Sequence, residues 1–170
     1  MTEFSTAGSC VGGIVVRDHD VFVFTFKREL IQFSLKKNKI FKKINAVSLG
    51  GNIVGMTSAE LDGRDLVLIT AHFEGKCVVW DFDYDAPVKI FNVARDHRLS
   101  CICLSGPNKV TLGTMSGGVA SLCIDDTPEE KEPIVPKSIE ISSKPIVSIC
   151  ADPNEARTVL VNSCGLVIIL

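Results

Sequence analysis

The chain has 170 residues, of which 46% are hydrophobic and 22% are charged, and its formal net charge at pH 7 is −2. This balance excludes a wholly disordered chain and a generally basic nucleic-acid-binding protein, although it leaves room for a local basic patch. No apolar run approaches the roughly 20 residues that span a bilayer. The first ten residues also lack the basic and apolar regions of a secretory signal. The sequence therefore predicts a nuclear or cytoplasmic protein that is neither secreted nor inserted in a membrane.

Short runs rich in Val, Ile, Phe and Thr alternate with Gly, Asn, Asp and Pro along almost the whole chain. This alternation is typical of β-strands joined by turns. After a tail over residues 1–10, the predicted strands in chain order are 11–16, 20–26, 30–35, 39–45, 53–59, 65–71, 76–82, 88–93, 99–105, 108–114, 118–124, 137–142, 146–151, 157–163 and 166–170. No segment keeps a 3.6-residue apolar period over three helical turns, so we expect an all-β fold.

The predicted strands fall into four similar groups, and the turn before the third strand of each group aligns them. The aligned turns hold Arg28, Gly75, Gly117 and Gly165. A large apolar residue follows five places later in every copy, at Phe33, Trp80, Leu122 and Leu170. A period of about 40–45 residues with four strands per unit indicates the blades of a β-propeller. The expected blades are residues 11–45, 53–93, 99–142 and 146–170.

The second unit carries the most specific motif. Its residues 71–81, AHFEGKCVVWD, resemble the end of a WD40 repeat, in which a glycine turn precedes a strand closed by Trp-Asp. Gly75 would supply a turn with positive φ, and Trp80, followed by Asp81, would fill the gap between neighbouring blades. The other copies keep the spacing but replace the Trp-Asp pair. The resemblance implies degenerate WD40 repeats over residues 11–170.

The fourth predicted unit ends at Leu170 without an outer strand. WD40 propellers usually close with six to eight blades, so we expect four antiparallel blades that form part of a ring. An open arc would leave an apolar blade face and the edge of residues 167–170 in water, which favours aggregation or a bound partner. The sequence therefore predicts a fragment or splice product. A small closed ring of four blades is the alternative.

A narrower resemblance covers residues 88–124. The order of features there, through VAR at 93–95, PNKVTLG at 107–113 and SGG at 116–118, is similar to the non-catalytic WD-repeat subunit of tRNA (guanine-N7) methyltransferase. This resemblance implies a propeller that binds the catalytic subunit and braces it against tRNA, with no catalytic residue of its own. Residues 162–168 depart from the family, because they lack the charges that its fourth blade tends to carry.

The strongest local charge is a basic hairpin predicted at the outer edge of the first unit. Its candidate phosphate-binding residues are Lys36, Lys37, Lys39, Lys42 and Lys43. Each contact with a phosphate, such as one on a tRNA backbone, would add affinity and salt sensitivity. The alternative is a solubilising hairpin, whose outer strand carries lysines that discourage pairing with another sheet edge.

Other clusters carry weaker chemical signals. The acidic, Pro-containing segment 125–133 is typical of a surface loop. Asp81, Asp83 and Asp85 lack the Gly and Glu that an EF-hand calcium loop requires. The seven cysteines lack the paired spacing of a zinc site and are expected to be buried free thiols. His72 is expected in a structural hydrogen-bond network with Asp81. The sequence thus predicts no metal, no cofactor, no catalytic residue and no enzymatic activity.

Together these features predict a non-catalytic WD-repeat scaffold that binds proteins and, through the basic hairpin, tRNA, rather than membranes or DNA. The specific prediction is the accessory subunit of a tRNA (guanine-N7) methyltransferase, which holds the catalytic subunit and positions tRNA. One alternative is a general WD40 adaptor in ubiquitin ligation, trafficking or ribosome assembly. An enzyme with acid and base groups converging in a central channel is the alternative from a different class.

Overall fold

The computed structural model describes residues 3–46, 51–61, 64–82, 86–93, 98–125, 137–138, 143–152 and 157–170, and these contain strands and turns without a helix. The predicted all-β class is therefore confirmed. In chain order, the strands are β1 (Val11–Arg17), β2 (Asp20–Thr25), β3 (Glu29–Ser34), β4 (Lys39–Asn45), β5 (Ile53–Leu61), β6 (Arg64–His72), β7 (Lys76–Asp81), β8 (Ala86–Asn92), β9 (Leu99–Gly106), β10 (Lys109–Thr114), β11 (Gly118–Cys123), β12 (Lys137–Ser138), β13 (Ile146–Asp152), β14 (Arg157–Asn162) and β15 (Val167–Ile169). Nowhere in the described ranges is there a helix long and apolar enough to cross a membrane.

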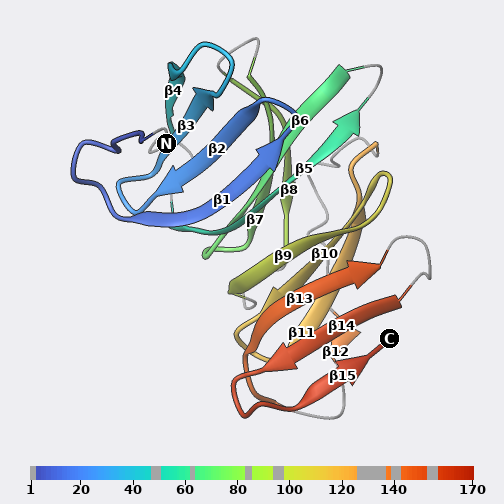
Figure 1. The fold of residues 1–170 in the computed structure, drawn as a ribbon. Helices are drawn as coiled ribbons and strands as arrows, with labels where there is room; N and C mark the ends of the chain where they lie inside the picture. The colour runs from blue at the N-terminus through green and yellow to red at the C-terminus, as the bar shows by residue number, and fades with distance from the viewer. Residues whose placement is uncertain are drawn as a thin grey trace.

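The strands form four antiparallel sheets in which each strand pairs with its neighbours in sequence. The first sheet is β1–β4, the second β5–β8, the third β9–β12 and the fourth β13–β15. Figure 1 shows the sheets following one another from the blue N-terminal sheet to the red C-terminal sheet, with the two chain ends on different sheets. The architecture is that of a partial β-propeller with three strands in its last sheet, as the sequence predicts.

Every sheet repeats one tight turn between its second and third strands. The backbone N–H groups of the four aligned residues donate to the carbonyl oxygen three residues earlier, over 2.9 to 3.2 Å. The donors are Arg28, Gly75, Gly117 and Gly165, and the acceptors are Thr25, His72, Thr114 and Asn162. All four donors have a positive φ, between 62° and 88°. Glycine adopts this conformation without steric cost, so Arg28 is the one copy with a side chain in a left-handed turn.

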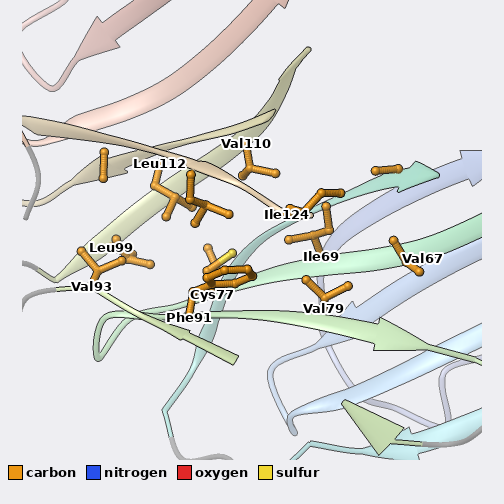
Figure 2. Packing of buried hydrophobic residues seen from close by; sticks show 14 of the residues in the cluster. Val67, Ile69, Cys77, Val79, Phe91, Val93, Leu99, Val110, Leu112 and Ile124 are labelled. Atoms are coloured by element: carbon orange, nitrogen blue, oxygen red, sulfur yellow. The ribbon is translucent and has the colours of Figure 1, made fainter. Parts of the chain in front are cut away.

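Successive sheets pack face to face through apolar side chains. The first strand of each sheet packs against the first strand of the next sheet in the chain: β1 against β5, β5 against β9, and β9 against β13. Figure 2 shows the cluster between the second and third sheets, in which Ile69 and Val79 meet Leu112 and Val110. These four side chains are completely buried. Burial of one such residue contributes about 1.5–3 kcal/mol, so the sheet interfaces dominate the stability of the array.

The array is open at its two ends. Among the described strands, β13 does not pack against β1, so the alternative of a closed four-bladed ring is wrong for this chain. The first strand exposes Ile14 and Val16, and the last strand exposes Val167 and Ile169. The expectation that an open arc leaves apolar side chains in water is therefore confirmed. The predicted strand 137–142 is described only at β12, and its other residues lie outside the described ranges.

A buried polar network connects the second and third strands of the second sheet. Trp80 Nε1 donates a hydrogen bond to Thr70 Oγ1 over 2.8 Å, and Thr70 Oγ1 lies 2.9 Å from His72 Nε2. The indole of Trp80 packs among Phe22 and Leu30 of the first sheet. Trp80 thus fills the space between two sheets while its polar nitrogen is satisfied within its own sheet. The predicted pairing of His72 with Asp81 stays a prediction.

We expect Thr70→Val to destabilise the protein more than Thr70→Ser. Valine keeps the shape but removes the hydroxyl, which leaves the buried Trp80 N–H without its acceptor and costs His72 one partner. Unsatisfied buried groups of this kind cost about 1–3 kcal/mol each, so we expect a loss of about 2–4 kcal/mol in the free energy of unfolding. Serine keeps the hydroxyl and lacks only the methyl group of threonine, whose burial contributes about 1 kcal/mol to the free energy of unfolding. Urea unfolding of both variants measures the difference, and equal losses would contradict a role for the hydroxyl.

Candidate nucleic-acid interface

The predicted basic hairpin is the outer strand pair of the first sheet. Strands β3 and β4 pair antiparallel from Glu29 opposite Asn45 to Ser34 opposite Lys39. The connecting residues 35–38 are exposed, and Asn38 turns the chain with a φ of 51°. Asparagine tolerates this conformation better than most residues, because its short polar side chain bonds locally. The turn therefore holds its lysines at the rim of the array.

A shallow, open hollow at this rim brings together residues that are distant in the sequence. It is lined by His19, Asp20, Ser34, Lys36, Lys37 and Phe41, which are hereafter called the rim hollow. His19 comes from the turn between β1 and β2, and Phe41 from β4. Two lysine side chains and an imidazole therefore line one hollow, together with the Asp20 carboxylate.

Phe41 gives the rim hollow a second recognition element. Its ring is half exposed, and Lys37 Nζ lies 4.2 Å from the ring centroid. An exposed aromatic ring beside a cation offers stacking to a base and a charge to the neighbouring phosphate, as single-stranded nucleic acid sites do. The Asp20 carboxylate, which also lines the hollow, accepts a hydrogen bond from Gln32 Nε2 over 2.7 Å, which fixes its orientation.

The other predicted lysines do not join this hollow. Lys42 points to the second sheet, where Nζ donates to the backbone carbonyl of Phe82. Lys43 forms an ion pair with Glu29, with 2.7 Å between Nζ and Oε1. This hydrogen bond is the main cause of the lowered pKa of Glu29. Lys39 is exposed at the start of β4. The five candidates therefore belong to separate environments, and only Lys36 and Lys37 line the hollow.

The Lys42 contact repeats one sheet further along the chain. Lys89 Nζ on β8 donates to the carbonyl oxygens of Ile124, over 2.8 Å, and Asp125, over 3.0 Å. Lys42 and Lys89 are separated by the same interval as Phe33 and Trp80. The outer strand of each of these sheets thus uses a lysine to hold the end of the third strand in the next sheet. We call these two residues the clamp lysines.

Sequence reasoning did not identify His19, Phe41 or the clamp lysines in these roles. The clamp had a detectable signal, because Lys42 and Lys89 occupy matching positions in the aligned repeats. The sequence carried no signal for His19, because its proximity to Lys36 depends on how the β1–β2 hairpin lies beside the β3–β4 hairpin. Of the four aligned apolar residues, Phe33, Trp80 and Leu122 are buried, whereas Leu170 is exposed.

The cysteines differ in burial, with two buried, two partly buried and three exposed. All seven are free, and Cys77 is fully buried, which raises its pKa to about 12. Burial also raises the pKa of Cys103 to about 11. Cys10, Cys150 and Cys164 are exposed, so the expectation of buried thiols is wrong for these three, which lie in the tail, on the uncovered fourth sheet and in a turn. The buried thiols are protonated at pH 7 and poorly nucleophilic.

Other predicted features lie partly outside the described ranges. These are His97, the aspartates at 83 and 85, and residues 126–133 of the acidic segment. Across the described residues, no group of three or more His, Cys, Asp or Glu side chains is arranged to hold a metal ion.

Comparison with known proteins shows the fold and leaves the family open. No protein-family model and no curated protein sequence matches the chain. The crystal structure of the computationally designed Ika4 protein is similar with a TM-score of 0.71 and 9% identity, over 99% of this chain and 95% of that one. Raptor from Chaetomium thermophilum is similar with a TM-score of 0.76 and 15% identity, over 96% of this chain and 15% of that one. The computationally designed Ika8 protein is similar with a TM-score of 0.67 and 10% identity, over 95% of this chain and 45% of that one.

We expect the clamp lysines to support stability rather than nucleic acid binding. Lys42→Met or Lys89→Met removes a charge-assisted hydrogen bond between sheets and should lower the free energy of unfolding by about 1–2 kcal/mol. Lys109→Met, at an exposed position on β10, is the matched control and should change it little. Urea unfolding measures all three. A loss of RNA affinity in Lys42→Met, without a loss of stability, would show that Lys42 belongs to the interface instead.

Proposed function

We propose that the chain is a non-catalytic scaffold of the WD-repeat type, which acts in the nucleus or cytoplasm by holding protein and RNA partners. The supporting observation is the repeated array itself, in which four packed sheets hold the described turns, such as residues 35–38, at fixed places along the rim. Scaffolds of this kind bind through loops and edges, because their sheet faces are used for packing.

The finer proposal is that the chain is the accessory subunit of a tRNA (guanine-N7) methyltransferase. Two features support it. Residues 88–124, which carry the sequence resemblance, include β9 and β10 of the third sheet. The rim hollow on the first sheet combines Lys36 and Lys37 with the exposed ring of Phe41, a chemistry suited to an RNA backbone and an unstacked base. In this proposal, the rim hollow contacts tRNA while another part of the array holds the catalytic subunit.

A general protein-binding adaptor is the second candidate. The observation that favours it is the apolar, uncovered face of the fourth sheet, where Val167 and Ile169 are exposed. Exposed apolar patches of this kind suit a protein surface better than RNA, because RNA backbone recognition rests on cations.

The methyltransferase proposal predicts both binding and activation. Co-expression of the full chain with a tRNA (guanine-N7) methyltransferase catalytic subunit should give a complex that co-purifies, and methylation of tRNA should be faster than with the catalytic subunit alone. Methyl incorporation at guanine N7 is measured under single-turnover conditions. Co-purification without activation favours the adaptor, and the absence of a complex rejects the accessory-subunit proposal.

The rim hollow makes a separate prediction about RNA affinity. Lys36→Glu combined with Lys37→Glu should weaken tRNA binding about tenfold or more near physiological salt. It should also flatten the dependence of log affinity on log salt by about 1–2, because each lost phosphate contact removes roughly 0.7–0.9 from the slope. Lys109→Glu combined with Lys144→Glu changes the net charge equally on exposed positions elsewhere. Fluorescence anisotropy with labelled tRNA measures both variants, and equal effects would show that only net charge matters.

A further inference from the structure

The two ends of the array present opposite faces of the same repeated unit. In the second and third sheets, Trp80 and Leu122 mark the face that packs on the preceding sheet, here called the leading face. Cys77 and Val79 mark the face of the second sheet that packs on the third, here called the trailing face. Each junction in the chain therefore joins the trailing face of one sheet to the leading face of the next.

The first sheet has a leading face with no sheet on it. Phe33, at the position of Trp80, clusters there with Ile31 and Val23. Ile14 and Val16 are paired with Val23 and Val21, and paired residues of antiparallel strands point to the same side, so both lie on this face. Ile14 is 60% exposed and Val16 is 63% exposed.

The N-terminal segment covers only part of this leading face. Phe4 stacks on Phe33, with 4.7 Å between the ring centroids, over the third strand of the sheet. The ion pair between Lys43 and Glu29 lies on the same outer side. The inner part, at Ile14 and Val16, stays open to solvent.

The fourth sheet has an uncovered trailing face. Its leading face packs on the third sheet through Leu160 and Ile168, which are buried. Val167 and Ile169 alternate with Ile168 along β15 and therefore point to the other side, where they are 57% and 68% exposed. Their strand partners Val161 and Val159 add apolar surface to this face.

We propose that a second copy of this chain covers both ends, so that two chains join head to tail into one closed ring of eight sheets. Each end of one copy lacks the face that the opposite end of the other copy offers. The two new junctions would then have the same kind of contact as the three junctions within the chain. A head-to-tail contact that closes after two copies gives a two-fold symmetric ring with no uncovered sheet face.

One solved structure has about the length that two copies of this chain would have. The chain matches 95% of the Ika4 chain but 45% of the Ika8 chain, so two copies placed end to end come to about the length of Ika8. Apolar surface on both ends also favours the proposal, since single soluble chains rarely leave two such faces in water. This inference is independent of RNA binding and of the methyltransferase proposal, because it concerns the sheet faces and not the rim hollow. It assigns the uncovered face of the fourth sheet to a second copy of the chain and not to the partner of an adaptor.

The first test is the mass of the full chain in solution. Sedimentation equilibrium at micromolar concentration should give twice the 18.4 kDa of one chain. A mass of one chain, or a series of growing polymers, would overturn the closed ring.

The second test uses one charged variant for each end. Ile14→Lys with Val16→Lys changes the leading face, and Val167→Glu with Ile169→Glu changes the trailing face. Every junction of the ring uses one face of each kind, so each variant alone should be monomeric. Phe26→Lys with Met115→Lys changes two exposed residues in turns outside both faces and should still form the dimer.

Mixing the two end variants gives the decisive result. In a mixed ring, one junction brings the lysines against the glutamates, and the other junction is unchanged. We therefore expect the mixture to recover the mass of two chains, with one copy of each variant by native mass spectrometry. Circular dichroism confirms that each variant is folded. A dimer of either variant alone would show that like faces pair, and a mixture that stays monomeric would overturn the head-to-tail arrangement.

Discussion

The packing of sheet on sheet is the interaction on which the rest of this structure depends. In the second sheet, residues 67–71 are buried at consecutive positions, although successive side chains of a strand point to opposite sides. Such a strand is stable only between two other sheets. In the fourth sheet, burial alternates instead, with Ile168 covered and its neighbours Val167 and Ile169 exposed. The same apolar composition thus gives a buried strand inside the array and a half-exposed one at its end.

The repeat could be predicted from the sequence because its signals are local. A tight turn needs a residue that tolerates positive φ, and an apolar residue at a fixed distance from it must face a neighbouring sheet. Gly75 and Trp80 satisfy both requirements, and Gly117 with Leu122 does so again. Arg28 is harder to recognise, because nothing in its side chain indicates the left-handed turn that it adopts. It could be aligned only through the residues around it.

The candidate functional surface was harder to predict, because lysines that are neighbours in the sequence can lie in different environments in the structure. Lys42 and Lys43 are adjacent in a strand, so period-two alternation sends them to opposite sides. One reaches the second sheet and the other reaches Glu29. The partner of Lys42 is 40 residues away, at Phe82, and depends on how two sheets stack. Counting lysines along the hairpin therefore overstates the charge that a ligand would meet.

The separation of structural from solvent-facing lysines limits what the rim hollow can do. Lys36 and Lys37 offer two ammonium groups, on a chain whose formal net charge is −2. Counterion release from two phosphate contacts gives a salt slope of only about 1.4–1.8, far below that of proteins that bind nucleic acid tightly by themselves. A hollow of this size, with the ring of Phe41 beside it, can orient an RNA but contributes modest affinity. In the function that we propose, most of the binding free energy of an RNA complex would therefore come from the protein partner and not from the rim hollow.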